Sequence, residues 1–274
     1  MMQTSAIRRQ YDEVIAPHYD LDPYAVIARS LERALGQLVR HGRLATGGDP
    51  LRVLDLGMGT GTFLTRLRAH TEHLKPFGID ISQKMIDIAR ERIPDLVAEV
   101  DDAANLDGQF GPEPFELICS HFVTGFVSVD VLAPRVHARL KPRGYWSLVG
   151  GTKAGFPVLR KKASGRLAKF LFGGRSPAVD EVVVNPADRG EVERALTANG
   201  FAIVEAETFT PGLDFKNLDE FMDFAYYGGW LTPFIEGLGL HTAKAVTRAA
   251  LNAFFFPVRD HHSIEVVLAR KATS

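Results

Sequence analysis

Along most of the chain, short apolar runs typical of strands alternate with segments in which apolar residues have helical spacing. Short apolar runs predict seven strands, at residues 52–56, 75–79, 96–100, 115–120, 145–149, 201–208 and 262–269. Between them, apolar residues recur with helical spacing at residues 62–72, 83–92, 131–140 and 186–199. Because strands that alternate with helices pair in parallel, we expect an α/β fold with a doubly wound, Rossmann-like and mostly parallel sheet.

Three segments lie outside this alternation. Residues 1–45 have a helical pattern, residues 151–180 follow the fifth strand, and residues 211–257 are rich in aromatic side chains. We predict a helical lid at 1–45, a sheet-containing core at 46–210 and 258–274, and a helical substrate cap at 211–257, inserted before the last strand. A segment of about 50 residues is marginal as an independent domain, so we expect the cap to pack over the carboxyl edge of the sheet.

A glycine-rich turn follows the first predicted strand. Asp55 ends this strand, and Gly57, Gly59 and Gly61 then occupy alternate positions before a helical segment. A dinucleotide-binding turn requires G-x-G-x-x-G, but the sixth position is threonine counted from Gly57 and leucine counted from Gly59. A phosphate-binding loop ends in G-K-[ST], which is absent after this turn. An ordinary turn between strand and helix is the alternative to a binding site.

The order acid-x-Gly-x-Gly-x-Gly resembles motif I of class I S-adenosylmethionine-dependent methyltransferases of the small-molecule, type 11/12-like kind. The resemblance implies S-adenosyl-L-methionine as the cofactor and a seven-stranded sheet whose last strand is antiparallel. It also implies that the backbone at Gly57, Gly59 and Gly61 approaches the cofactor closely. Asp55 would face the methionine ammonium group, or else accept hydrogen bonds from the amides of the turn.

Two further signals follow the next two strands. Asp80 ends the second strand, 19 residues after the last of the three glycines, where an acid can accept hydrogen bonds from both ribose hydroxyls; capping of the next helix is the alternative. Ile81 would pack against adenine. In the same family, an acid followed by a small residue after the third strand contacts adenine, and Asp102 with Ala103 resembles that pair, although Asp101 is an alternative register.

The N-terminal segment adds a weaker resemblance. Residues 11–20 resemble the Tyr-Asp…Ala…Tyr-Asp segment of small-molecule methyltransferases, in which the tyrosines close over the cofactor. The corresponding residues are Tyr11 and Tyr19. Aromatic packing of a helical hairpin explains the same residues equally well.

Methyl transfer from a sulfonium requires in-line alignment more than a covalent nucleophile, so candidate catalytic residues are few. His121 follows the fourth strand and is our candidate general base, with a structural histidine as the alternative. Tyr226, Tyr227 and Trp230 are predicted to bind the substrate, since aromatic residues beside glycines suit the wall of an organic-substrate pocket. They suit the core of a helical cap equally well.

Composition narrows the range of partners. The net charge is −1, which gives no field for recruiting nucleic acid, and the single Cys119 suits a reducing compartment. We expect a cytoplasmic protein without a transmembrane segment and without a metal ion. Residues 152–176 are basic and amphipathic; they indicate either a solvated helix or contact with a membrane surface. The oligomeric state stays open.

Together the motifs predict an S-adenosylmethionine-dependent methyltransferase that methylates an oxygen, nitrogen or carbon of a small organic molecule. Two alternatives share the cofactor motifs: an enzyme that uses the cofactor for cyclisation or another alkyl transfer, and a non-catalytic binding protein.

Overall fold

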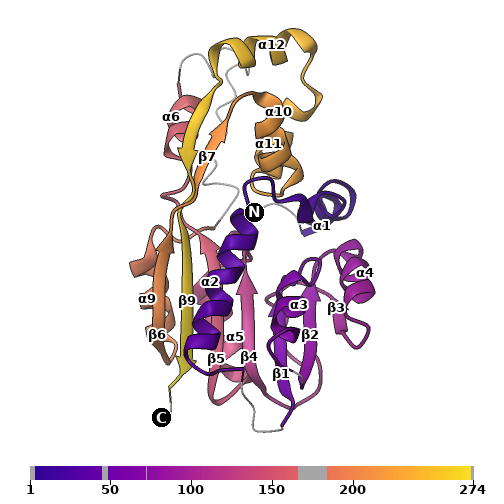
Figure 1. The fold of residues 1–274 in the computed structure, drawn as a ribbon, viewed down its shortest axis with the longest axis vertical. Coiled ribbons are helices and arrows are strands. Elements are labelled where there is room, and N and C mark those ends of the chain that lie inside the picture. Colours follow the sequence, from indigo (N-terminus) through magenta and orange to yellow (C-terminus); the bar gives the residue numbers. More distant parts are fainter. Residues whose placement is uncertain (1–3, 45–48, 72, 166–183, 273–274) are drawn as a thin grey trace.

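The computed structural model describes residues 4–44, 49–71, 73–165 and 184–272. Its main sheet has seven strands in the order β3-β2-β1-β4-β5-β9-β6 (Figure 1). The strands are β1 (Leu51–Leu56), β2 (Leu74–Asp80), β3 (Val97–Val100), β4 (Phe115–His121), β5 (Leu140–Gly151), β6 (Phe201–Phe209) and β9 (Ile264–Lys271). Only β9 is antiparallel to its neighbours β5 and β6, which confirms the predicted fold.

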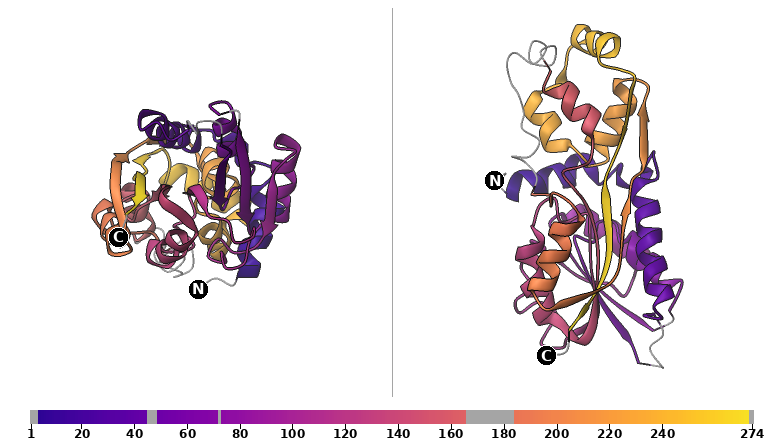
Figure 2. Two further views of the ribbon diagram at one scale, coloured as in Figure 1. Left: turned by 90° about the horizontal axis from the view of Figure 1, so that it is seen from below. Right: turned by 90° about the vertical axis from the view of Figure 1, so that its left-hand side faces the viewer.

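Helices cover both faces of the sheet. One face carries α2 (Val26–Arg40), α3 (Thr62–Arg68) and α4 (Gln83–Arg92), and the other carries α5 (Val129–Arg139) and α9 (Arg189–Ala198). Figure 2 shows these two layers with the sheet between them. In β1, Val53 packs in the first layer and Leu54 in the second, as the two-residue period of a strand requires. Burial on both faces explains the nearly continuous apolar runs.

The strand order reverses between β1 and β4. In a doubly wound sheet, the crevice beyond the carboxyl ends of the strands at such a switch point binds ligands. The glycine turn leaves β1 and His121 ends β4 at this place. The fold therefore brings the predicted cofactor motifs and the predicted catalytic residue to one edge.

A cap stands above this edge (Figure 1). Its helical elements are α6 (Pro157–Ala163), α10 (Leu218–Met222), η3 (Asp223–Tyr227), α11 (Thr232–Leu238), η4 (Leu240–Thr242) and α12 (Ala245–Phe254). A two-stranded antiparallel sheet of β7 (Gly212–Phe215) and β8 (Val258–His261) joins it to the main sheet. This pairing was not predicted, because four-residue strands leave little periodic signal.

The described part of the predicted N-terminal lid, residues 4–44, occupies two separate positions. Helix α1 (Thr4–Gln10), η1 (Tyr11–Ile15) and η2 (Tyr19–Leu21) lie between the cap and the sheet edge, whereas α2 packs against β5 and β9. The segment from α1 to η2 is thus the part of the predicted lid that adjoins the cap. Among the described residues, no helix is long and apolar enough to cross a membrane.

Candidate active site

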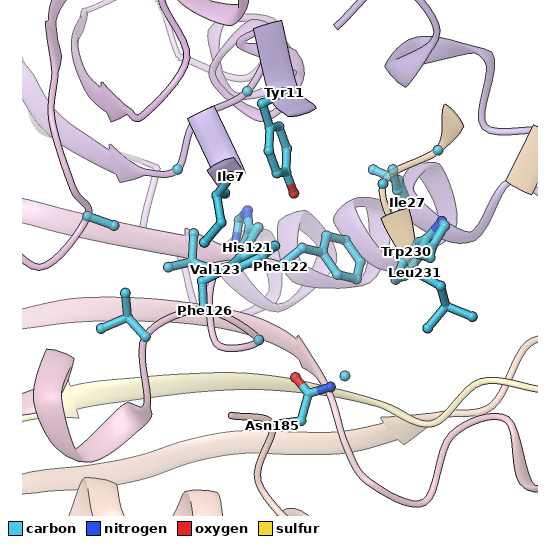
Figure 3. Close-up of a pocket in the computed structure, with 18 of the residues that line it drawn as sticks. Ile7, Tyr11, Ile27, His121, Phe122, Val123, Phe126, Asn185, Trp230 and Leu231 are labelled. Atoms are coloured by element: carbon cyan, nitrogen blue, oxygen red, sulfur yellow. The ribbon is translucent and has the colours of Figure 1, made fainter. Parts of the chain in front are cut away.

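The carboxyl edge of the sheet, the N-terminal helices and the cap enclose a cavity of about 320 Å³. Figure 3 shows side chains from all three parts directed toward it: Tyr11 and Ile7 from the N-terminal helices, His121 from β4, and Trp230 from the cap. Most of the predicted site residues line this one cavity. The exceptions are Asp55, Gly61, Tyr226 and Tyr227.

The three glycines of the turn have different surroundings. Gly57 and Gly59 line the cavity with φ values of +67° and +54°, which disfavour residues that carry a Cβ. A Cβ on Gly57 would lie 2.2 Å from Val123 Cγ2, and one on Gly59 would lie 3.3 Å from the Tyr19 ring. Gly61 also has a positive φ, but its Cβ would meet α4. The first two glycines therefore shape the cavity, and Gly61 lets α3 pack on α4.

Asp80 closes one side of the turn. Its Oδ2 accepts a hydrogen bond from the Gly59 amide at 2.8 Å, and its Oδ1 accepts one from the Ser82 amide at 2.9 Å. Burial raises the Asp80 pKa to about 6, although these backbone hydrogen bonds oppose the shift. Ser82 itself caps α4 through its hydroxyl. An ionised carboxylate offers about four acceptor positions, so Asp80 can hold the turn and still accept from a ligand.

Asp55 lies beneath the turn rather than in the wall of the cavity. It is only 2% exposed, and it pairs with Gly78 of β2 and Cys119 of β4. Burial and the nearby charge of Asp80 raise its pKa to about 7. Asp55 therefore does not lie where it could directly contact a ligand in this cavity.

The loop after β3 resolves the register that the sequence left open. Asp102, Ala103 and Ile81 line the cavity, and Asp101 does not. The Asp101 carboxylate instead accepts hydrogen bonds from the Asp102 amide and from the side chain of Asn105. Asp101 thus holds the loop in shape while its neighbour faces the cavity.

Tyr11 and Tyr19 face the cavity from the N-terminal segment. The Tyr11 hydroxyl points into it (Figure 3). Burial raises the pKa of both phenols, and the charge of Asp80 adds to the effect. Both hydroxyls are therefore neutral and able to donate hydrogen bonds.

Two aspartates fasten this N-terminal segment to the core. Asp12 Oδ1 accepts a hydrogen bond from the Ser82 hydroxyl at 2.6 Å. Asp20 accepts one from the Thr60 hydroxyl at 2.7 Å and forms an ion pair with Arg92 at 2.6 Å. The tyrosines are thus tied to the same turn and helix that carry the glycines and Asp80.

His121 is buried at the end of β4, 7% exposed. Its Nε2 lies 3.0 Å from the Ser147 hydroxyl, and its Nδ1 has no hydrogen-bond partner among the described residues. The ring stands edge-on to Phe63 at 4.2 Å. Burial lowers the His121 pKa to about 3, so the imidazole is neutral at physiological pH.

Trp230 forms the aromatic wall on the cap side. Its ring stacks on Phe224 at 5.3 Å and meets the rings of Phe122 and His262 edge-on, each at 5.1 Å. The other two aromatic candidates, Tyr226 and Tyr227, make different contacts. Tyr226 bonds to Glu236 at 3.3 Å, and the Tyr227 ring lies 4.9 Å from that of His18.

The sequence analysis did not include Phe126, Phe156, Asn185, Arg160 or His262 in the site, although all five line the cavity. His262 is 3% exposed, and its Nδ1 accepts a hydrogen bond from the Ser263 amide at 2.9 Å. The ring proton therefore sits on Nε2. A Cβ at Gly155 would lie 2.4 Å from this ring. The glycines after the fifth strand were the available signal, since they mark a close approach.

Among the residues that the structure describes, no group of three or more histidine, cysteine, aspartate or glutamate side chains could hold a metal ion. The basic segment 152–176 is described only as far as residue 165. In that described part, Leu159 of α6 is buried. The remainder of that prediction lies outside the described residues.

Known proteins resemble this chain in its domain and in its fold. Residues 53–144 match the family model of a methyltransferase domain. A demethylmenaquinone methyltransferase from Thermotoga maritima is 43% identical over 58 residues, 21% of this chain and 25% of that protein. The chain therefore spans about a quarter of the length of the curated relative it matches.

Solved structures extend the likeness in fold to most of the chain. The YcgJ protein of Bacillus subtilis is 18% identical, with a TM-score of 0.55 over 89% of this chain and 100% of that one. A Bacillus halodurans protein, provisionally named a methyltransferase, is 16% identical. Its TM-score is 0.57 over 87% of this chain and 99% of that one. At these identities the likeness shows the fold.

Residues 53–144 thus match a methyltransferase domain, and the chain has the Rossmann-like methyltransferase fold. Both findings support the resemblance to class I S-adenosylmethionine-dependent methyltransferases that the glycine motif indicated.

Proposed function

We propose that the protein transfers a methyl group from S-adenosylmethionine to an oxygen, nitrogen or carbon of a small organic acceptor by in-line displacement. The single observation that carries the proposal is that one cavity joins the cofactor motifs to an apolar, aromatic wall. His121 and Phe122 lie at the end of β4, where these two parts meet. A ligand held by the motifs would therefore adjoin space for a second molecule.

The cofactor half fits a nucleoside with an amino-acid tail. Asp80 retains acceptor positions for the two ribose hydroxyls, and the absence of a Cβ at Gly57 and Gly59 leaves room for close approach to the backbone. Asp102 and Ala103 supply an acceptor and a backbone amide for adenine. When bound, S-adenosylmethionine supplies a methyl group on a sulfonium, which is electrophilic without help from a covalent nucleophile.

His121 would position the acceptor rather than remove its proton. A general base is most effective when its pKa lies near the working pH, and burial lowers the His121 pKa to about 3. A cation placed beside the ring would lower that pKa further. Its Nδ1 is buried and has no hydrogen-bond partner among the described residues. We therefore expect an acceptor that arrives as a neutral amine or an already ionised oxygen.

The acceptor half is mostly apolar, with a few polar groups. Trp230, Phe122 and Phe156 provide aromatic surface, and Asn185 and His262 provide polar contacts. A few polar groups within an apolar wall are typical of pockets for small organic molecules. The name of the Thermotoga maritima relative includes demethylmenaquinone, but the match covers only 21% of this chain. It therefore does not define the acceptor here, and the cytoplasmic location likewise stays a proposal.

Calorimetric titration with S-adenosylhomocysteine and with NAD tests the cofactor. We expect the first to bind and the second not to bind; the reverse result would contradict the proposal. Radiolabelled S-adenosylmethionine, incubated with small phenols, amines and carboxylic acids, then tests transfer. Label in a product with wild-type protein, but not with Asp80→Asn, supports methyl transfer. Binding of the cofactor with a changed but unlabelled product would instead indicate cyclisation or another use.

A further inference from the structure

The cap contains a second cavity, of about 60 Å³, between α6, α10, α11 and α12. Its walls include Leu159 and Ala163 of α6, Phe221 of α10, Leu238 of α11 and Leu251 of α12. Arg160 is the polar residue among the described lining, and its Nε donates a hydrogen bond to the Gly155 carbonyl at 2.9 Å. The rest of this lining is apolar.

The two cavities adjoin. Phe156, Arg160 and Leu231 line both of them. Phe156 also stacks on His262, with ring centroids 4.4 Å apart. The cap cavity therefore begins where the acceptor half of the larger cavity ends, on the side of the cap.

We propose that the cap cavity is a binding site for a short apolar side group of the acceptor, such as an ethyl or propyl group, while the reactive atom lies near His121. The inference rests on the proposed function and specifies its substrate class. An empty apolar cavity lowers the stability of a fold, and an apolar group would fill this one. A cavity of about 150 Å³ holds benzene, so by proportion the cap cavity has room for about two to three carbon atoms.

A series of 4-alkylphenols tests the site, from 4-methylphenol to 4-hexylphenol. Binding is measured by calorimetry in the presence of saturating S-adenosylhomocysteine. Because each buried methylene contributes about 0.8 kcal/mol, we expect about fourfold tighter binding for each added carbon, up to about three carbons, and no further gain beyond. Absence of chain-length dependence, or of any binding, in the wild-type protein would overturn the inference.

Two variants locate the effect. Ala163→Phe fills the cap cavity, whereas Val158→Phe adds an aromatic ring on the same helix at a residue that is 37% exposed and outside the cavity lining. We expect the gain per carbon to be lost in Ala163→Phe and kept in Val158→Phe. Equal gains in both variants would place the alkyl chain elsewhere. If Ala163→Phe fails to fold, Leu238→Phe fills the same cavity from α11.

Titration with S-adenosylhomocysteine alone separates this inference from the proposed function. Failure of that ligand to bind contradicts the cofactor assignment, and the phenol series without it still reports on the cap cavity. Normal binding of S-adenosylhomocysteine with a flat phenol series contradicts only the side-group site.

Discussion

Replacement of Asp80 by asparagine tests the cofactor contact most sharply. The carboxylate uses one oxygen for the Gly59 amide at 2.8 Å and the other for the Ser82 amide at 2.9 Å. Asparagine has the same shape, but its NH₂ group replaces one acceptor oxygen. This group cannot accept a hydrogen bond, so one of the two backbone amides or the ligand loses its acceptor. The variant therefore loses charged acceptors where a ribose would bind.

A hydrogen bond to a charged group contributes about 1.5–3 kcal/mol. We therefore expect Asp80→Asn to weaken S-adenosylhomocysteine binding by about 10-fold to 150-fold, measured by calorimetry at pH 8. Asp87→Asn is the matched control, since Asp87 is exposed on α4 and accepts a hydrogen bond from Gln83. An unchanged dissociation constant in a folded Asp80→Asn protein would refute the ribose contact.

The pH dependence gives a second readout with a defined sign. Burial raises the Asp80 pKa to about 6, so the ligand-binding ionised form is lost as the pH falls through 6. At pH 5 about one tenth of the carboxyl is ionised, and we expect about tenfold weaker binding in the wild-type protein. Ligand binding should strengthen as the pH rises, but the free energy of unfolding of the unliganded protein should fall. Because the carboxyl pKa of Asp80 is higher in the folded state than in the unfolded state, its contribution to this energy decreases between about pH 4 and 6. Asp80→Asn should remove the trend in binding and reduce the trend in the free energy of unfolding, to which Asp55 contributes in the same direction.

Four other variants test separate parts of the account. Gly57→Ala should lower the free energy of unfolding by about 1–3 kcal/mol, because its Cβ would lie 2.2 Å from Val123 Cγ2; chemical denaturation should show partial rescue when Val123→Ala is added. Asp55→Asn should stabilise the unliganded protein more at pH 8 than at pH 5, by about 3 kcal/mol at most, because burial raises the Asp55 pKa to about 7; equal effects at both pH values would contradict that shift. Trp230→Ala should raise the KM for the acceptor and leave the affinity for S-adenosylhomocysteine unchanged. Weaker binding of S-adenosylhomocysteine would contradict the assignment of Trp230 to the acceptor wall. His121→Ala should lower kcat but leave the shape of its pH profile between pH 6 and 9 unchanged. If a pH-dependent limb of the wild-type profile disappeared in the variant, His121 would act as a general base.

The part of the cavity that we assign to the cofactor was predictable because its determinants are local. Parallel strands present their carboxyl ends at one edge, so residues directly after β1, β2 and β3 meet there whatever packs around them. Asp80, Asp102 and the first two glycines follow this rule. Gly61 does not line the cavity because it lies one step further, at the start of α3, where its missing Cβ allows packing on α4.

The acceptor half depends on tertiary contacts that leave little trace in the sequence. Of the three aromatic candidates in the cap, only Trp230 faces the cavity. The π-helix η3 and the following turn determine which ring points inward, and a 3.6-residue period does not describe either. His262 enters from the residues between β8 and β9, beyond the short unpredicted sheet. Its position follows from the pairing of segments far apart in sequence.

A crystal structure with S-adenosylhomocysteine tests the central claim most directly. We predict that the ribose hydroxyls lie within hydrogen-bond distance of the Asp80 carboxylate, that adenine lies between Ile81 and the loop of Asp102 and Ala103, and that the sulfur faces His121. The same compound bound elsewhere, with the turn at Gly57 and Gly59 left without it, would contradict the account.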